Sequence, residues 1–241
     1  MSGHSKWATT KRQKAAVDAK RGAVFTKMAN LITIAARKGN DPTMNFSLRL
    51  AMDKARTANM PKENIERAIK RGTGELAGAQ IEELIYEGFG PAKSQFIIKC
   101  LTDNKNRTAA AIRHLFSASN GSLGSVIWNF ELKGIIRIEK LIISELITNL
   151  DQFELELIDI GAQDIKQEKE GMTIYTKPED LPKVKQYLET KNIKTETAEI
   201  EYLAKEQTDL SDEDKKKVQT LIDELEENED VSDYYHNISN V

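Results

Sequence analysis

The sequence is poor in the residues that form disulfides, metal sites and membrane spans. Its 241 residues include one cysteine and three histidines, which stand far apart and lack the spacing of a metal site. A lone cysteine cannot form a disulfide within the chain, which fits a reducing compartment. No apolar run approaches the ~20 residues of a membrane-spanning helix, and no apolar core follows the basic N-terminus as in a secretory signal. We therefore expect a cytoplasmic protein with no metal and no membrane partner.

Motifs of catalysis are also missing. The sequence has no phosphate-binding loop and no nucleophile elbow. Gly72, Gly74 and Gly78 have the wrong spacing for a dinucleotide-binding loop and follow a helical segment rather than a strand. Asp103 ends a predicted strand, where catalytic carboxylates are often found, but the simpler interpretation is that it turns the chain into the next helix. We predict that the protein is not an enzyme and has no catalytic residue, cofactor or small-molecule substrate.

The chain does contain a strongly divided charge distribution. Residues 1–75 hold 16 Lys and Arg against 6 Asp and Glu, a net charge of +10, whereas residues 76–241 carry a net charge of −13. The formal net charge of −3 conceals this division. A positive field attracts polyanions, of which nucleic acids are the most abundant in cells. The acidic remainder would repel a phosphate backbone, so we expect nucleic acid to bind at the N-terminal end.

The densest run of cations lies between residues 6 and 27. Asp18 is the one acid near it, so the run lacks the acids at i±4 that neutralise a solvated helix. It also has almost no apolar face, which is typical of an arm or of a helix ordered by its partner. Trp7 could stack on a base or dock on the protein, and a merely solvated helix is the alternative for the whole run. The predicted contacts are Lys6, Trp7, Lys11, Arg12, Lys14, Lys20, Arg21 and Lys27.

Behind this run, the sequence predicts three short amphipathic helices. The first covers about residues 23–38. Asp41 and Pro42 supply the N-cap and the first turn of the second helix. Pro61 opens the third helix, and Gly72 ends it. Together they predict a small bundle.

Beyond Gly74, strands and helices alternate. Residues 80–131 predict two strands, a helix and a last strand at 125–130, and Cys100 lies in the buried strand 95–102 as a small hydrophobe rather than a reactive thiol. Residues 132–205 then predict strand-helix-strand-strand-helix-strand, the ferredoxin-like pattern, with one helix at 144–160. A charged helix from Ser211 and a strand at 231–236 have no partner of their own. They supply the second helix and the further strand that residues 80–131 need to form a complete sheet-and-helix domain.

The predicted fold class is therefore α+β. It consists of an N-terminal three-helix bundle with a basic arm, followed by two α/β domains of ferredoxin-like type, the third inserted in the second. The expected bounds are 1–75 for the basic helical domain, 76–131 plus 206–241 for the discontinuous middle domain, and 132–205 for the inserted domain.

Short motifs along nearly the whole chain resemble those of the YebC/PmpR family. They begin in the basic run, continue through the predicted bundle, and return at the end of the chain, while residues 132–205 match least distinctively. The motifs include Gly3-His4-Ser5-Lys6-Trp7, Asp18-Ala19-Lys20-Arg21-Gly22, Ala58-Asn59-Met60-Pro61-Lys62-Glu63-Asn64-Ile65, Gly72-Thr73-Gly74, Tyr86-Glu87-Gly88, Thr102-Asp103-Asn104, Asn106-Arg107-Thr108 and Tyr235-His236-Asn237.

The resemblance implies three domains, the third inserted in the second, and a non-enzymatic regulator of gene expression. Bacterial members are usually described as DNA-binding transcriptional regulators. The mitochondrial relative is a translational activator of cytochrome oxidase, and bacterial members are also linked to ribosomes stalled on proline-rich nascent chains. By this analogy Lys62 and Arg67, near the Asn59–Lys62 loop, are further candidate contacts, although the loop could be a plain connection between helices.

Two functions from different classes therefore remain open, a transcriptional regulator on DNA and a ribosome-associated translation factor that meets ribosomal RNA or tRNA. The charge distribution fits both. A basic arm with one aromatic residue and no groove-reading element favours the recognition of folded RNA, whereas the usual description of the family favours DNA. A protein-interaction scaffold whose arm serves solubility is a third possibility.

The basic run predicts a steep salt dependence of nucleic-acid binding. If about six cations meet phosphates, the affinity should fall by roughly 10³-fold between 50 and 200 mM salt, because binding releases condensed counterions. A fluorescence-anisotropy titration of full-length protein at several salt concentrations measures this slope. A flat salt dependence would contradict phosphate contacts by the basic run.

Overall fold

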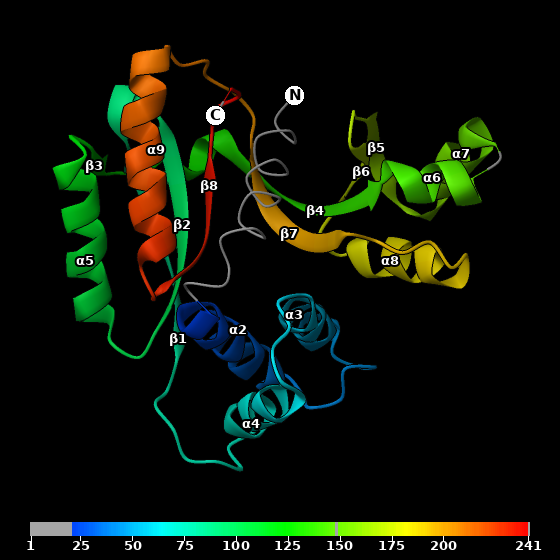
Figure 1. Cartoon of the computed structure of the whole chain (residues 1–241), viewed down its shortest axis with the longest axis horizontal. Coiled ribbons are helices and arrows are strands. Elements are labelled where there is room, and N and C mark those ends of the chain that lie inside the picture. The colour runs from blue at the N-terminus through cyan, green and yellow to red at the C-terminus, as the bar shows by residue number, and fades with distance from the viewer. Residues whose placement is uncertain (1–20, 148, 241) are drawn as a thin grey trace. The chain divides into compact units, whose positions relative to one another are not determined.

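The computed structural model describes residues 21–147 and 149–240 of the chain. They form two compact units, one that runs up to Asn129 and resumes at Ala204, and a second that comprises Phe130–Leu203. The expected insertion at 132–205 corresponds to the second unit with slightly shifted ends. Figure 1 shows helices that lead into a sheet in the first unit and a separate sheet with its own helices in the second. The predicted α+β class is confirmed.

The predicted three-helix bundle is also confirmed. Its helices are α2 (Arg21–Ala36), α3 (Phe46–Thr57) and α4 (Lys62–Gly72). Their apolar faces share one core that includes Ile32, Leu48 and Ile65. Met28, Ile32, Ala35 and Ala36 are the buried residues that α2 contributes to this core, so the packing of its apolar face holds this helix in the bundle.

The N-cap predicted at Asp41 is wrong, because Asn45 performs that role for α3. The side-chain oxygen of Asn45 accepts the backbone N–H of Leu48 at 3.1 Å. Its amide nitrogen also donates to the carbonyls of Ala35 (2.8 Å) and Gly39 (2.7 Å), which satisfies the end of α2. One buried amide thus closes both helix ends, while Asp41 accepts hydrogen bonds from Thr43 in the preceding turn.

Gly72 ends α4 as predicted, and its lack of a side chain also has a packing role. A Cβ at this position would lie 2.4 Å from the carbonyl oxygen of Thr33 and 2.7 Å from Cβ of Ala36, both on α2. Glycine therefore allows α4 to approach the backbone of α2 closely. The left-handed conformation after the helix belongs to Gly74, at φ 83°.

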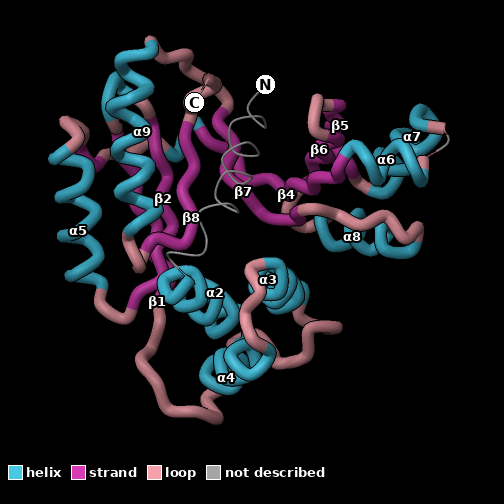
Figure 2. The backbone as a smooth tube through the Cα atoms, viewed as in Figure 1, coloured by secondary structure: helices cyan, strands magenta, loops and turns pink. Residues whose placement is uncertain are grey.

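The sheet of the first unit has the order β3-β1-β2-β8. Figure 2 shows its strands with the long helices α5 and α9 beside them. Phe96, Ile98 and Cys100 of β2 share a core with residues of both helices, so α5 and α9 cover the same face. Cys100 is fully buried, as predicted. The elements are β1 (Glu82–Phe89), a 3₁₀ turn (Pro91–Lys93), β2 (Gln95–Thr102), α5 (Lys105–Ala118), β3 (Ser122–Leu123), α9 (Asp212–Glu227) and β8 (Val231–His236).

Two predictions for this sheet are wrong. The strand expected at 125–130 is instead a turn that contains the 3₁₀ segment Ile127–Asn129, while pairing with β1 is made earlier, by β3. The carboxylate of Glu87 fixes the turn by accepting the backbone N–H groups of Val126 (2.7 Å) and Ile127 (2.8 Å). The sheet is also not ferredoxin-like, because its two central strands, β1 and β2, are joined directly.

The second unit does have the ferredoxin-like order, β5-β6-β4-β7. Its core lies between the sheet and its helices, and includes Ile136, Ile138 and Ile174. The single helix predicted at 144–160 is two helices, because Asn149 caps a new one through the backbone N–H of Gln152. The elements are β4 (Phe130–Glu139), α6 (Lys140–Leu146), α7 (Leu150–Ile160), β5 (Ala162–Gln167), β6 (Gly171–Thr176), α8 (Leu181–Thr190) and β7 (Thr197–Ala204).

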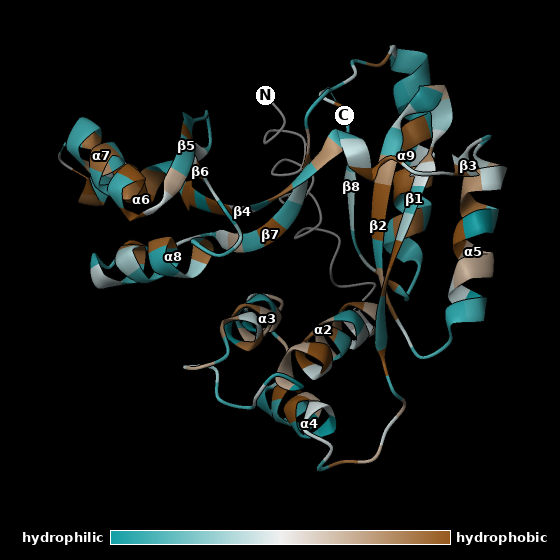
Figure 3. Cartoon of the chain, turned by 180° about the vertical axis from the view of Figure 1, so that it is seen from behind, coloured by the Kyte–Doolittle hydropathy of each residue, from teal (hydrophilic) through white to brown (hydrophobic). Residues whose placement is uncertain are grey.

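Hydropathy follows this architecture in both units. Figure 3 shows helices with hydrophobic and hydrophilic stripes rather than uniformly hydrophobic surfaces. Among the described residues, none of the helices is long and apolar enough to cross a bilayer.

The close approach at Gly72 predicts an effect on stability. Gly72→Ala should lower the free energy of unfolding by about 1–3 kcal/mol, because the methyl group overpacks the contact with α2, although alanine favours helices. Chemical denaturation of the full-length variant measures the change. Gly22→Ala is the control, because a Cβ there meets no atom within 4 Å. Equal effects of the two substitutions would contradict the packing role.

Candidate nucleic-acid interface

The ten residues predicted to contact nucleic acid fall into two groups. Arg21 begins α2, and Lys27, Lys62 and Arg67 lie farther along the bundle. Nothing is described of the Arg21 side chain. The remaining predicted contacts lie outside the described residues, and these are Lys6, Trp7, Lys11, Arg12, Lys14 and Lys20.

Lys27 does not lie with the other two described side chains. Its ammonium group donates to the carbonyl oxygen of Glu226 at 2.8 Å, at the C-terminal end of α9. A cation is favourable there, because the last carbonyls of a helix carry partial negative charge and lack partners within the helix. Lys27 thus connects the bundle to α9 of the same unit.

Two further cations of the bundle have the same kind of role. The guanidinium of Arg37 donates to the carbonyl oxygen of Ile81 at 2.6 Å. The ammonium group of Lys54 lies 3.1 Å from the carboxylate of Asp233 on β8. Part of the positive charge counted in the sequence is therefore used to hold the bundle against the sheet.

The Asn59–Lys62 loop has the features of a packed connection between helices. Met60 is buried in the core of the bundle, and Asn59 takes the left-handed conformation at φ 57°. The side chain of Lys62 is 90% exposed and lies 3.6 Å from Glu66, a surface ion pair of small energy. This geometry fits the plainer of the two interpretations, while Lys62 stays a predicted contact.

Arg67 lines a groove between α2 and α4. Asn64, Arg67 and Arg71 follow one another at i, i+3 and i+7, so they form one stripe along α4. The groove has a volume of about 200 Å³. Sequence analysis identified Arg67 but missed Asn64 and Arg71, although their helical spacing was a usable signal. The lining residues are Phe25, Thr26, Ala29, Met60, Asn64, Arg67, Ala68 and Arg71.

Among the residues that the structure describes, the cations of this stripe have no counterion. Within residues 21–147 and 149–240, no ion pair or side-chain hydrogen bond holds Arg67 or Arg71. The Nε atom of Arg71 is buried without a hydrogen-bond partner in the same part of the chain. Lys38 and Lys70, also exposed, are likewise unpaired there.

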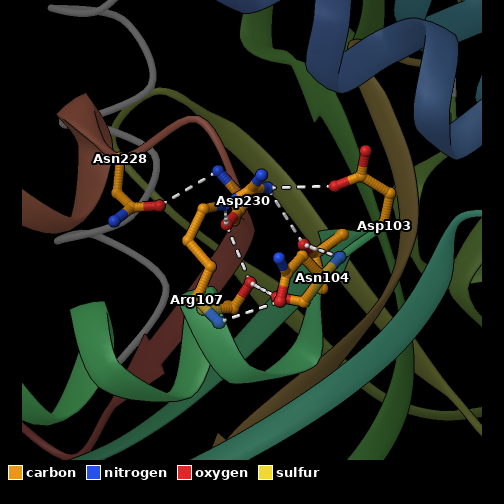
Figure 4. A network of polar contacts seen from close by, with 7 residues as sticks. Asp103, Asn104, Arg107, Asn228 and Asp230 are labelled. Atoms are coloured by element: carbon orange, nitrogen blue, oxygen red, sulfur yellow. Dashed lines mark hydrogen bonds and ion pairs between the residues drawn. The ribbon is translucent and has the colours of Figure 1, made fainter.

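A second polar cluster lies where α5 begins and where the chain passes from α9 to β8 (Figure 4). The carboxylate of Asp230 accepts hydrogen bonds from the guanidinium of Arg107 (2.9 Å) and the hydroxyl of Thr108 (2.8 Å). Asn104 caps α5 through the backbone N–H of Arg107 at 3.1 Å. Asp230 raises the pKa of the Arg107 guanidinium by hydrogen bonding and by its charge. This cluster joins the start of α5 to the connection between α9 and β8 within the first unit.

Asp103 belongs to the edge of the same cluster. Its carboxylate accepts from Arg107 at 3.2 Å, and its side chain is 44% exposed. The neighbouring thiol of Cys100 is buried, which raises its pKa to about 12 and keeps it protonated at neutral pH. Among the described residues, no group of His, Cys, Asp and Glu could hold a metal ion.

Comparison with known proteins identifies the family. Residues 5–75 match the model of the TACO1/YebC protein N-terminal domain, and residues 81–238 match that of the TACO1/YebC second and third domain. The chain belongs to the TACO1/YebC family. The resemblance inferred from the motifs is confirmed.

Members of the TACO1/YebC family match the chain over its length. A protein of Thermoanaerobacter pseudethanolicus named probable transcriptional regulatory protein is 49% identical over 244 residues, which cover 99% of this chain and 97% of the relative. A protein of Chlorobaculum tepidum with the same description is also 49% identical and covers 99% of this chain, with 95% of its own length aligned. The crystal structure of a conserved hypothetical protein from Aquifex aeolicus superposes with a TM-score of 0.80 at 39% identity and 93% coverage of each chain.

The Asp230 cluster predicts that this carboxylate stabilises the first unit. Asp230→Ala should lower the free energy of unfolding by about 1–3 kcal/mol, because it removes the carboxylate acceptor of Arg107 and the nearer of the two acceptors of the Thr108 hydroxyl, which also contacts the carbonyl of Asn104. A thermal melt followed by circular dichroism checks this. Asp103→Ala, which loses one exposed contact, should leave the melting temperature nearly unchanged. A larger loss for Asp103→Ala would contradict this ranking.

Proposed function

We propose that this TACO1/YebC protein is a non-enzymatic, nucleic-acid-binding regulator of gene expression that acts in the cytoplasm. The observation that carries the proposal is a set of cations on the bundle that have no partner in the described part of the chain. Arg67, Lys70 and Arg71 gather at the end of α4, and they add to the basic run of residues 6–27. A charged surface without counterions gains free energy from phosphate binding, because condensed ions are released from the nucleic acid.

The first candidate target is DNA. The relatives from Thermoanaerobacter and Chlorobaculum both bear the name probable transcriptional regulatory protein. Identity near one half over the full length supports a shared biochemical role. On this reading, the bundle would bring its cations to the phosphates of a promoter region.

The second candidate target is RNA on the ribosome, in a protein that aids translation of proline-rich nascent chains. The shape of the bundle favours it. Arg67 and Arg71 line a concave surface shared with α2, whereas a DNA-recognition helix inserts a protruding face into the major groove. Concave basic surfaces suit the unstacked nucleotides of folded RNA.

Absence of catalysis is part of the proposal. The carboxylate of Asp230 accepts hydrogen bonds from Arg107 and Thr108, and these contacts stabilise the fold. Asp103 pairs with Arg107 at the rim of this cluster, away from any described nucleophile–base pair. These contacts support a structural interpretation of both carboxylates.

Charge reversal at three residues of the basic run tests the proposal. Lys11→Glu, Arg12→Glu and Lys14→Glu together should abolish binding to both ribosomes and DNA at moderate salt, since three favourable phosphate contacts become repulsive. Ribosome co-sedimentation from cell extract and a gel shift on promoter DNA at matched salt measure the two targets. Thermal unfolding should be unchanged, because we predict that the segment buries little.

A matched control reverses three charges elsewhere. Lys169, Lys177 and Lys194 are exposed and unpaired in the described part of the second unit, and their change to Glu should leave binding intact. A stable ribosome peak of the unmodified protein that disappears on charge reversal assigns the protein to translation, whereas a salt-resistant, sequence-selective shift of promoter DNA assigns it to transcription. If the unmodified protein binds neither RNA nor DNA nor ribosomes at low salt, the proposed function is refuted.

A further inference from the structure

The groove between α2 and α4 has the composition of a nucleotide-binding site. We propose that it takes one unstacked nucleotide of a single-stranded nucleic acid, with the phosphate on Arg67 and Arg71 and the base against Phe25. This inference rests on the proposed function and deepens it, because it assigns a specific site and a specific state of the nucleic acid. The following steps carry it.

The size of the groove limits what it can hold. Its volume of about 200 Å³ is below the roughly 300–1,000 Å³ of sites for whole small molecules. A groove of this size accommodates one planar ring and its attached phosphate at the rim. It is too small for a folded peptide segment or a complete cofactor.

The charge on one wall selects an anion. Arg67 is exposed and Arg71 half-buried, and both lack a counterion within the described residues. Guanidinium groups bind phosphate through paired hydrogen bonds with matched geometry. Two of them one helical turn apart on α4 can hold the same phosphate or two successive ones.

Part of this wall is positioned before any ligand arrives. Gly78 packs so closely on Arg71 that a Cβ there would lie 2.9 Å from Cδ and 3.0 Å from Nε. The loop after α4 therefore restricts the stem of Arg71, and its Nε is buried without a partner. A restricted guanidinium loses less conformational entropy on binding.

The remainder of the groove suits a base. Phe25 supplies a flat ring that is partly exposed, and Ala29 and Met60 add an apolar surface beside it. Bases stack on aromatic rings with little dependence on sequence. Asn64, at the same groove, offers an amide whose donor and acceptor can pair with a base edge.

The concave shape of the groove favours single-stranded nucleic acid over a duplex. In a duplex the bases are stacked and paired, so the ring of Phe25 cannot meet a base face without unstacking. Loops and single strands present splayed bases at no such cost. The groove therefore predicts a preference for single strands over duplexes of the same sequence.

The experiment compares full-length variants by fluorescence anisotropy with a labelled single-stranded RNA, the same sequence as single-stranded DNA, and the matching duplexes. Arg67→Ala with Arg71→Ala should weaken single-strand binding at least tenfold near 100 mM salt. The slope of log affinity against log salt should fall by about 1.4, since each lost phosphate contact on a single strand contributes about 0.7.

Two further variants separate the site from general charge. Lys177→Ala with Lys194→Ala removes the same number of cations at exposed positions outside the groove lining and should weaken binding less than threefold. Phe25→Leu keeps an apolar side chain but removes the ring. It should weaken single-strand binding severalfold without changing the salt slope, because no phosphate contact is lost.

Structural damage is checked independently. Thermal melts identify any unfolded variant, and Arg67→Ala alone, at an exposed position, replaces the double variant if that one unfolds. Amide chemical shifts of the isotopically labelled unmodified protein, titrated with the single-stranded RNA, should move at the groove-lining residues. Shifts confined to other surfaces would overturn the proposal.

The outcomes distinguish the two levels of inference. If the unmodified protein binds none of the nucleic acids, the proposed function fails. If it binds but the groove variants match the lysine control, or if duplexes bind as tightly as single strands with the same loss on Arg67→Ala, the function survives and the groove site is wrong. Preference for RNA over DNA among the single strands identifies the physiological source of the nucleotide.

Discussion

The first unit depends on the late pairing of β8 with β2. The strand at Val231–His236 comes after the second unit in the sequence and pairs with β2 opposite residues such as Ile97 and Ile98. The preceding helix, α9, supplies Val218, Leu221 and Leu225 to the core. Without this segment the sheet would lack one edge and the core one layer. The Asp230 carboxylate closes the arrangement by binding α5, and the bundle is attached to the same segment through Lys27 and Lys54.

Charge in the bundle therefore serves two purposes that composition cannot separate. Lys27, Arg37 and Lys54 bind acceptors within the unit, so their charge is neutralised or dispersed. Arg67 and Arg71 have no such acceptor among the described residues. The electrostatic field available to a polyanion is thus smaller than the net charge of residues 1–75 indicates, and Arg67 and Arg71 of α4 contribute part of it.

Much of the fold could be predicted from the sequence where burial and local pattern agree. The strands at 95–102 and 231–236 have the predicted bounds, because each lies between clear breaks in the pattern. One of the errors occurs where a side chain far along the chain decides. Glu87 binds the amides of Val126 and Ile127 and turns a strand-like segment into a 3₁₀ turn. The Asn64–Arg71 stripe was visible as a helical period, but its groove requires α2, whose distance no single-sequence pattern specifies.

The geometry of the groove follows from the contacts that fix its two walls. On α2, the helical period places Lys27 opposite Phe25 and Ala29, so the side that binds α9 and the side that lines the groove are back to back. On α4, Gly72 sets the separation of the helices at one end by its contact with Thr33. Both walls are therefore held by packing that no ligand provides. An apolar floor fixed by packing, with guanidinium groups above it that are unpaired within the described residues, loses little conformational entropy on binding, and for this reason we propose the groove as the part of the bundle that discriminates between forms of nucleic acid.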